Sequence, residues 1–134
     1  MKVKNIIFLA LALMLTASCT KHELDPRFVE SEEIRLIVEG RNIFSYNERN
    51  CQMAYNAGKH EFRVFTDNMS DYYSLRLSSV PKVLNQEVSG EIAWNTEAES
   101  GSVYGSAFKA IRLEGGKIWL WDAADGIAVV VSCL

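Results

Sequence analysis

The side chains that could act as acid, base or nucleophile are few, and their positions do not favour catalysis. The predicted folded region holds one histidine, His60, between Lys59 and Glu61 at the start of a strand, where we expect it to be exposed to solvent. A nucleophilic triad needs a base with a pKa near neutral pH and a nucleophile on a sharp turn, and the chain has no Gly-x-Ser-x-Gly sequence. The sequence therefore gives no support to a serine hydrolase.

Two pairs of carboxylates, Asp122 with Asp125 and Glu97 with Glu99, lie close in sequence. Glycoside hydrolysis uses two such groups, one of them a general acid with a raised pKa. Both pairs fall in segments typical of turns, where carboxylates stay solvated. Three cysteines and two histidines are also too few for a zinc module with several ligands. We expect no catalytic residue, metal or cofactor.

Two tryptophans, Trp119 and Trp121, are two residues apart in a predicted strand, so their side chains share one face of it. If Ile118 and Leu120 face the core, both indoles stand on the outside. That spacing suits stacking against successive rings of a polysaccharide, and Tyr104 or Trp94 would extend the platform. The alternative is that both faces of this strand are buried and the indoles are structural.

The segment Ser100-Gly101-Ser102-Val103-Tyr104 resembles the inhibitory loop of the membrane-bound C-type lysozyme inhibitors, which are small lipid-anchored β-barrels. The resemblance implies that Ser100, Gly101 and Tyr104 belong to a loop that enters a lysozyme's catalytic cleft. The Tyr-x-Cys of that family is missing, since Arg49 and Asn50 precede Cys51. An ordinary solvent-exposed loop is the alternative.

The first 18 residues have the pattern of an export signal. Lys2 and Lys4 are followed by the apolar run Ile6–Leu15, which at ten residues is too short to span a bilayer. Small residues and then Cys19 follow, an order that resembles a bacterial lipobox, with Thr16 where leucine is usual. The resemblance implies that Cys19 carries lipid and anchors the chain to a membrane.

Residues 19–26 are predicted to be a polar tether after the lipidated cysteine. Lys21, Glu23 and Asp25 partly match the export tags on surface lipoproteins of the Bacteroidota, and the chain resembles the small exported lipoproteins of that group. The expected location is the bacterial outer membrane, facing either the surface or the periplasm.

Turn residues recur every eight to twelve residues from Arg27 to Leu134, which predicts one all-β domain, an antiparallel sandwich or barrel of about seven to eight strands. Phe44–Tyr46 and Cys51–Tyr55 are short candidates. In Tyr72–Val80, Tyr73, Leu75 and Leu77 share one face, and Ser74, Arg76 and Ser78 share the other. The last three strands, Ala107–Glu114, Lys117–Trp121 and Ile127–Cys133, form a meander around a Gly-Gly turn.

Lipidation of Cys19 would leave Cys51 and Cys133 as a pair in an oxidising compartment. The sequence leaves two alternatives, a disulfide between them and two unpaired thiols.

The formal charge of the whole chain is −3. Because two of its 14 basic residues lie in the leader, the mature chain carries 12 against 17 acidic residues, or −5. This charge argues against a nucleic-acid partner.

These observations favour a non-catalytic binding or accessory module of the cell envelope, attached through the lipid on Cys19. Its expected partner is a glycan or another envelope protein. The first alternative is an inhibitor of a lysozyme-like hydrolase, and the second is a structural subunit that pairs through a free edge strand.

Overall fold

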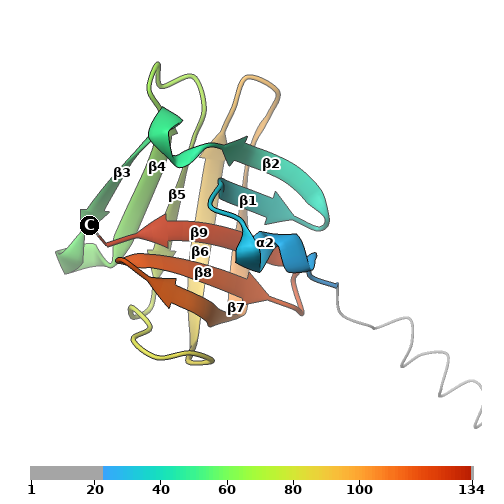
Figure 1. Cartoon of the computed structure of the whole chain (residues 1–134), viewed down its shortest axis with the longest axis vertical. Coiled ribbons are helices and arrows are strands. Elements are labelled where there is room, and N and C mark those ends of the chain that lie inside the picture. The colour runs from blue at the N-terminus through green and yellow to red at the C-terminus, as the bar shows by residue number, and fades with distance from the viewer. Residues whose placement is uncertain (1–22, 134) are drawn as a thin grey trace, which may run out of the picture.

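Nine antiparallel strands form one sheet that curls into a nearly closed barrel (Figure 1), as seen in a computed structural model that describes residues 23–133. The strands are β1 (Ile34–Val38), β2 (Arg41–Tyr46), β3 (Cys51–Asn56), β4 (Glu61–Thr66), β5 (Tyr72–Leu77), β6 (Glu87–Asn95), β7 (Ser100–Glu114), β8 (Lys117–Asp122) and β9 (Ile127–Ser132). Short helical segments are α2 (Pro26–Glu30), η1 (Glu48–Asn50) and η2 (Ala57–Lys59). The predicted export signal, Cys19 and residues 20–22 lie outside the described residues.

The strand order is β2-β1-β9-β8-β7-β6-β5-β4-β3, so β2 and β3 are the edges of the sheet. The last strand pairs with the first, and β3 and β4 contact β9 without pairing with it. The all-β prediction and the C-terminal meander are confirmed. There are nine strands, more than the number expected, because both short candidates form strands of six residues.

Glycines allow the chain to turn and the sheet to curl. Gly115 and Gly116 join β7 to β8 with φ of +58° and +84°, the left-handed conformation that a two-residue hairpin requires. Gly90 and Gly105 face each other on β6 and β7, next to a register shift. A Cβ on Gly105 would lie 2.4 Å from the Phe108 ring, so the two strands bend there around an aromatic side chain.

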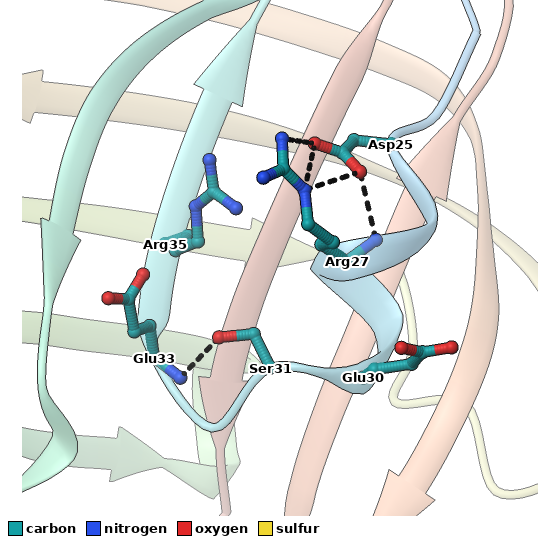
Figure 2. A pocket seen from close by; sticks show the side chains of 6 residues that line it. All are labelled: Asp25, Arg27, Glu30, Ser31, Glu33 and Arg35. Atoms are coloured by element: carbon teal, nitrogen blue, oxygen red, sulfur yellow. Dashed lines mark hydrogen bonds and ion pairs between the residues drawn. The ribbon is translucent and has the colours of Figure 1, made fainter.

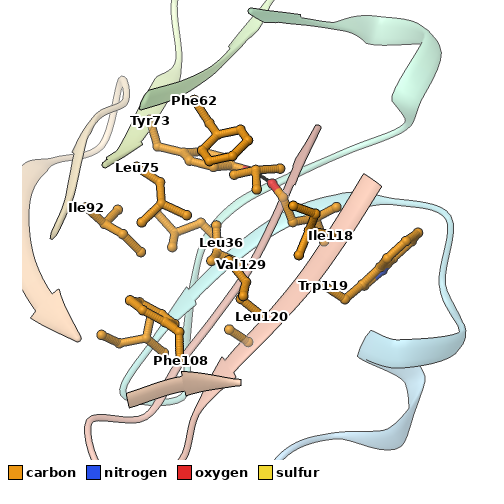
Figure 3. Close-up of a cluster of buried hydrophobic side chains, with 14 of the residues drawn as sticks. Leu36, Phe62, Tyr73, Leu75, Ile92, Phe108, Ile118, Trp119, Leu120 and Val129 are labelled. Carbon is orange, nitrogen blue, oxygen red and sulfur yellow. Dashed lines mark hydrogen bonds between the residues drawn. The ribbon is translucent and has the colours of Figure 1, made fainter. Parts of the chain in front are cut away.

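The barrel interior is filled by the inward residues of alternating strands (Figure 3). Leu36, Leu120 and Val129 are register partners on β1, β8 and β9, and all three are fully buried. Tyr73 projects from β5 into the same interior, where its hydroxyl donates to the backbone carbonyl of Val130. The Val130 carbonyl lies beyond the segment of β9 that pairs with β1, so the Tyr73 hydroxyl supplies this carbonyl with a hydrogen-bond donor.

The outer side of β8 and β9 is also buried, because α2 lies against it (Figure 1). Asp25 caps α2 by accepting a hydrogen bond from the Arg27 amide at 2.9 Å, and Pro26 is its first residue. Phe28 is the buried residue of this helix. Arg112 on β7 holds the end of α2 by donating to the Val29 carbonyl at 2.8 Å. Among the described residues, no helix is long and apolar enough to cross a membrane.

Candidate functional site

The predicted indole platform is not formed. Ile118 and Leu120 face the core, which is the condition that the platform required, and Trp119 points to the outside of the sheet (Figure 3). It is nevertheless fully buried, because α2 lies over this side of β8 and the Arg112 guanidinium stacks 4.0 Å from its ring centre. Trp119 is therefore a structural residue and not part of a surface platform.

Trp121 and Tyr104 remain accessible but do not share a platform. Trp121 is half-buried and opposite Lys109 on β7. Tyr104 is 57% exposed and precedes Lys109 by five residues on the same strand, about 16 Å along it. The tryptophan and the tyrosine therefore cannot contact neighbouring sugar rings.

Residues Ser100 to Tyr104, expected in a loop, are the first part of β7. They pair in register with Glu91–Asn95 of β6, from Ser100 opposite Asn95 to Tyr104 opposite Glu91. Backbone pairing holds this segment in the sheet, so it does not project as an inhibitory loop does.

Asp122 and Glu99, two of the candidate catalytic carboxylates, accept hydrogen bonds from other residues of the fold. Asp122 is fully buried, and its Oδ1 and Oδ2 accept hydrogen bonds from the amides of Asp125 and Ala107. Burial raises the pKa of Asp122. Glu99 accepts a hydrogen bond from Arg41 at 2.7 Å, which lowers its pKa. Within residues 23–133, no cluster of three or more histidine, cysteine or acidic side chains could hold a metal.

The remaining sequence candidates are likewise not part of a site. His60 is half-buried and ends η2 in the left-handed conformation. Cys51 and Cys133 are free thiols, so the disulfide considered for them is not formed. Cys51 begins β3, and Cys133 directly follows β9. Burial raises the pKa of Cys51 to about 11.

A hollow beside α2 is lined by charged side chains (Figure 2). Arg27 donates hydrogen bonds to both carboxylate oxygens of Asp25, and the side chain of Arg35 points into the same space. Glu30 and Glu33 complete the lining with Ser31. Two arginines against three acids leave no excess of positive charge for an anion, so this hollow favours no particular ligand.

The outer side of β4 and β5 carries exposed apolar side chains that no other part of the described chain covers. Phe65 on β4 and Tyr72 on β5 are Cα partners, and both side chains point away from the core. Tyr72 is 45% exposed and Met69, in the connecting loop, is 67% exposed. With Arg63 and Ser74 these three side chains line a hollow of about 370 Å³, which we call the aromatic hollow.

The β4–β5 loop places Met69 by a network of short-range hydrogen bonds. The Thr66 hydroxyl donates to Asn68 Oδ1 at 2.9 Å and accepts from the Asp71 amide, and the Met69 amide donates to the Thr66 carbonyl at 2.8 Å. Met69 itself has a φ of +61°, an uncommon conformation for a residue with a side chain. The loop is therefore built to hold an exposed apolar side chain beside the two aromatic rings.

Arg63 is weakly engaged within the protein. Its guanidinium lies 3.5 Å from Glu61, which it shares with Arg76 at the same distance. Both arginine side chains are more than 60% exposed, so these ion pairs contribute little to stability. Arg63 is free to donate hydrogen bonds to a ligand in the aromatic hollow.

The sequence contains a signal for this site in the alternation of β5. Alternation along Tyr72–Leu77 places Tyr73 and Leu75 inside, and the structure confirms it. The same alternation puts Tyr72 outside with Ser74. An aromatic residue on the polar face of a strand is the pattern to notice.

Comparison with known proteins adds no further guide, because no family model, curated protein or solved structure matches the chain.

Proposed function

We propose that this protein is a non-catalytic binding module of the bacterial cell envelope, anchored to the outer membrane by lipid on Cys19, that binds a carbohydrate in the aromatic hollow. The observation that carries the proposal is the pairing of Phe65 and Tyr72 on an exposed strand face beside Met69 and Arg63. Aromatic faces supply apolar contact for the C–H surface of a sugar ring, and the arginine and serine supply hydrogen bonds to its hydroxyls.

The two other sequence hypotheses have unequal support. The inhibitor hypothesis depended on a projecting loop, and Ser100–Tyr104 lies in a paired strand instead. The assembly hypothesis retains one favourable observation: β3 is an edge strand of six residues with no charged side chain, although charges commonly protect such edges. If β3 pairs with a partner strand, Ala54→Lys prevents co-purification of that partner.

Affinity electrophoresis of the full chain in gels containing neutral polysaccharides tests the main proposal. A suitable panel is β-glucan, xylan, mannan and amylose. Retardation by one of them should be lost in Tyr72→Ala and strongly reduced in Phe65→Ala. Leu84→Ala is the matched control, because Leu84 is 56% exposed on the loop at the other end of β5. Equal retardation of Tyr72→Ala and the unmodified protein would refute the assignment of the site.

The anchor is tested separately from the binding site. Cys19→Ala should move the protein from the membrane fraction to the soluble fraction of cells that express it. Cys133→Ala, which removes a thiol at the other end of the chain, should leave it in the membrane fraction. Membrane association of Cys19→Ala would contradict lipid attachment at this residue.

A further inference from the structure

The outer face of β4 to β7 continues beyond the aromatic hollow as regular rows of side chains. Ser74 of β5 is opposite Ala93 of β6, and Ala93 is opposite Ser102 of β7. These three side chains are small, and no large side chain of the same row stands between them. The row therefore leads from the hollow across the sheet, with the backbone close to the surface.

Tyr104 stands at the far side of this row. It is 57% exposed and lies next to Ser102 on the outer face of β7. Two strand spacings and four residues of strand separate it from Tyr72, so the two rings are roughly 16 Å apart. That distance exceeds the size of one sugar ring and corresponds to a chain of several.

Polar groups along this path are available to a ligand. Across the part of the chain that the structure describes, the side chains of Ser74, Asn95 and Ser102 form no hydrogen bond within the protein. Each lies on the outer face, where it is partly or fully exposed. Hydroxyl and amide groups of this kind both donate and accept hydrogen bonds, as sugar hydroxyls do.

The charges beside the path cancel. Arg63 and Arg76 face Glu61, and Glu91 is the register partner of both Arg76 and Tyr104. Two positive and two negative side chains leave no net charge at the surface. Electrostatic complementarity therefore favours a neutral chain over a polymer with a carboxylate or sulfate on each unit.

We propose that the ligand is a neutral polysaccharide whose extended chain crosses β4 to β7, from Phe65 and Tyr72 at one end to Tyr104 at the other. The inference rests on the proposed carbohydrate-binding function and adds the charge, length and direction of the ligand to it. Tyr72 binds one ring, the row from Ser74 to Ser102 hydrogen-bonds the rings between, and Tyr104 binds a distal ring.

Isothermal titration of the full chain with an oligosaccharide series tests this path. The series runs from the disaccharide to the hexasaccharide of whichever neutral polysaccharide retards the protein. We expect affinity to rise with length. Tyr104→Ala should weaken hexasaccharide binding about tenfold, the loss of one ring contact, and leave disaccharide binding unchanged. Tyr104→Phe keeps the ring and should bind both ligands almost as the unmodified protein does.

A second variant fills the path instead of removing its end. Ala93→Tyr places a large side chain in the row of small residues, on an exposed strand position that tolerates tyrosine. It should weaken the hexasaccharide and spare the disaccharide. Ser106→Ala, on the same strand as Tyr104 but outside the path, is the control for general effects.

The possible results separate the inference from the function it rests on. Equal affinity for short and long ligands, with loss only in Tyr72→Ala, would overturn the extended path and preserve carbohydrate binding. Tighter binding of a uronic acid polymer than of the neutral one would overturn the charge assignment. Equal weakening of both ligands in Tyr104→Ala would show an effect on the fold and overturn the distal contact. Failure of every polysaccharide in the panel would overturn both proposals.

Discussion

Replacing Phe28 by alanine tests whether α2 is the element that buries Trp119. Phe28 is 1% exposed and is the single buried residue of a five-residue helix. A helix of this length is not stable in water by itself, so α2 depends on this side chain and on the Arg112 hydrogen bonds to its end. Without the phenyl ring, we expect α2 to leave the surface of the sheet.

The size of the effect follows from burial. Truncation of a fully buried phenylalanine costs about 3–5 kcal/mol, and because the space beneath α2 opens to water, we expect the lower end, about 3 kcal/mol. With a dependence on urea of about 1.5 kcal/mol per M, the unfolding midpoint should fall by about 2 M. Leu84→Ala, on an exposed loop, should change the free energy of unfolding by less than about 0.5 kcal/mol.

Fluorescence gives a second, local readout. The chain has three tryptophans, so Trp94→Phe and Trp121→Phe together leave Trp119 as the sole emitter. In that background Phe28→Ala should shift the emission to longer wavelength before any unfolding, because the indole meets water. A loss of stability below about 1 kcal/mol with unchanged emission would refute this account, and would mean that Arg112 and Lys117 bury Trp119 without the helix.

Three other predictions concern polar groups. Tyr46→Phe should reduce the free energy of unfolding by about 1.5–3 kcal/mol in urea titrations, because the buried Asp71 carboxylate loses the Tyr46 hydroxyl 2.5 Å away, whereas Tyr104→Phe should have no effect. Burial raises the pKa of the Asp122 carboxyl above its usual value of 3.8. Protonated Asp122 therefore contributes fully to the free energy of unfolding below pH 3.8, and this contribution is lost as the pH rises through the raised pKa. Asp122→Asn should flatten this part of the curve of unfolding midpoint against pH. Iodoacetamide should modify Cys51 slowly at pH 8 and faster as pH approaches 11, as followed by mass spectrometry, and a rate at pH 8 like that of a free thiol would contradict the raised pKa.

Much of the fold could be predicted because local signals determine it. The Gly115-Gly116 turn fixes the register of β7 and β8, and period-two alternation identifies the inward residues of β5 and β6. The helix α2 also had a local signature that was not used, an Asp-Pro at the N-cap and first position. The early start of β7 is harder to anticipate, since Ser100-Gly101-Ser102 has the composition of a loop and becomes a strand by pairing with β6.

The environment of Trp119 could not be predicted from its own strand. Its exposure depends on α2, which meets β7 through a hydrogen bond between Arg112 and Val29, 83 residues apart in the chain. Alternation tells which side of the sheet a residue faces and says nothing of what covers that side. Phe65 and Tyr72 show the converse, because their strands carry the same alternation and no segment within residues 23–133 crosses their outer side.

The two sides of the barrel thus differ in a way that fits a tethered binding protein. Helix α2 lies against the outer side of β8 and β9, whereas the aromatic hollow lies on the outer side of β4 and β5, so different strands carry these two features. The chain from the proposed anchor at Cys19 enters the described structure directly before α2. The proposed anchor is therefore linked to the domain beside β8 and β9, and not at the strands that carry the aromatic hollow. The proposed path from Phe65 and Tyr72 to Tyr104 therefore does not cross the part of the sheet that α2 covers, which leaves the path open to an extended ligand.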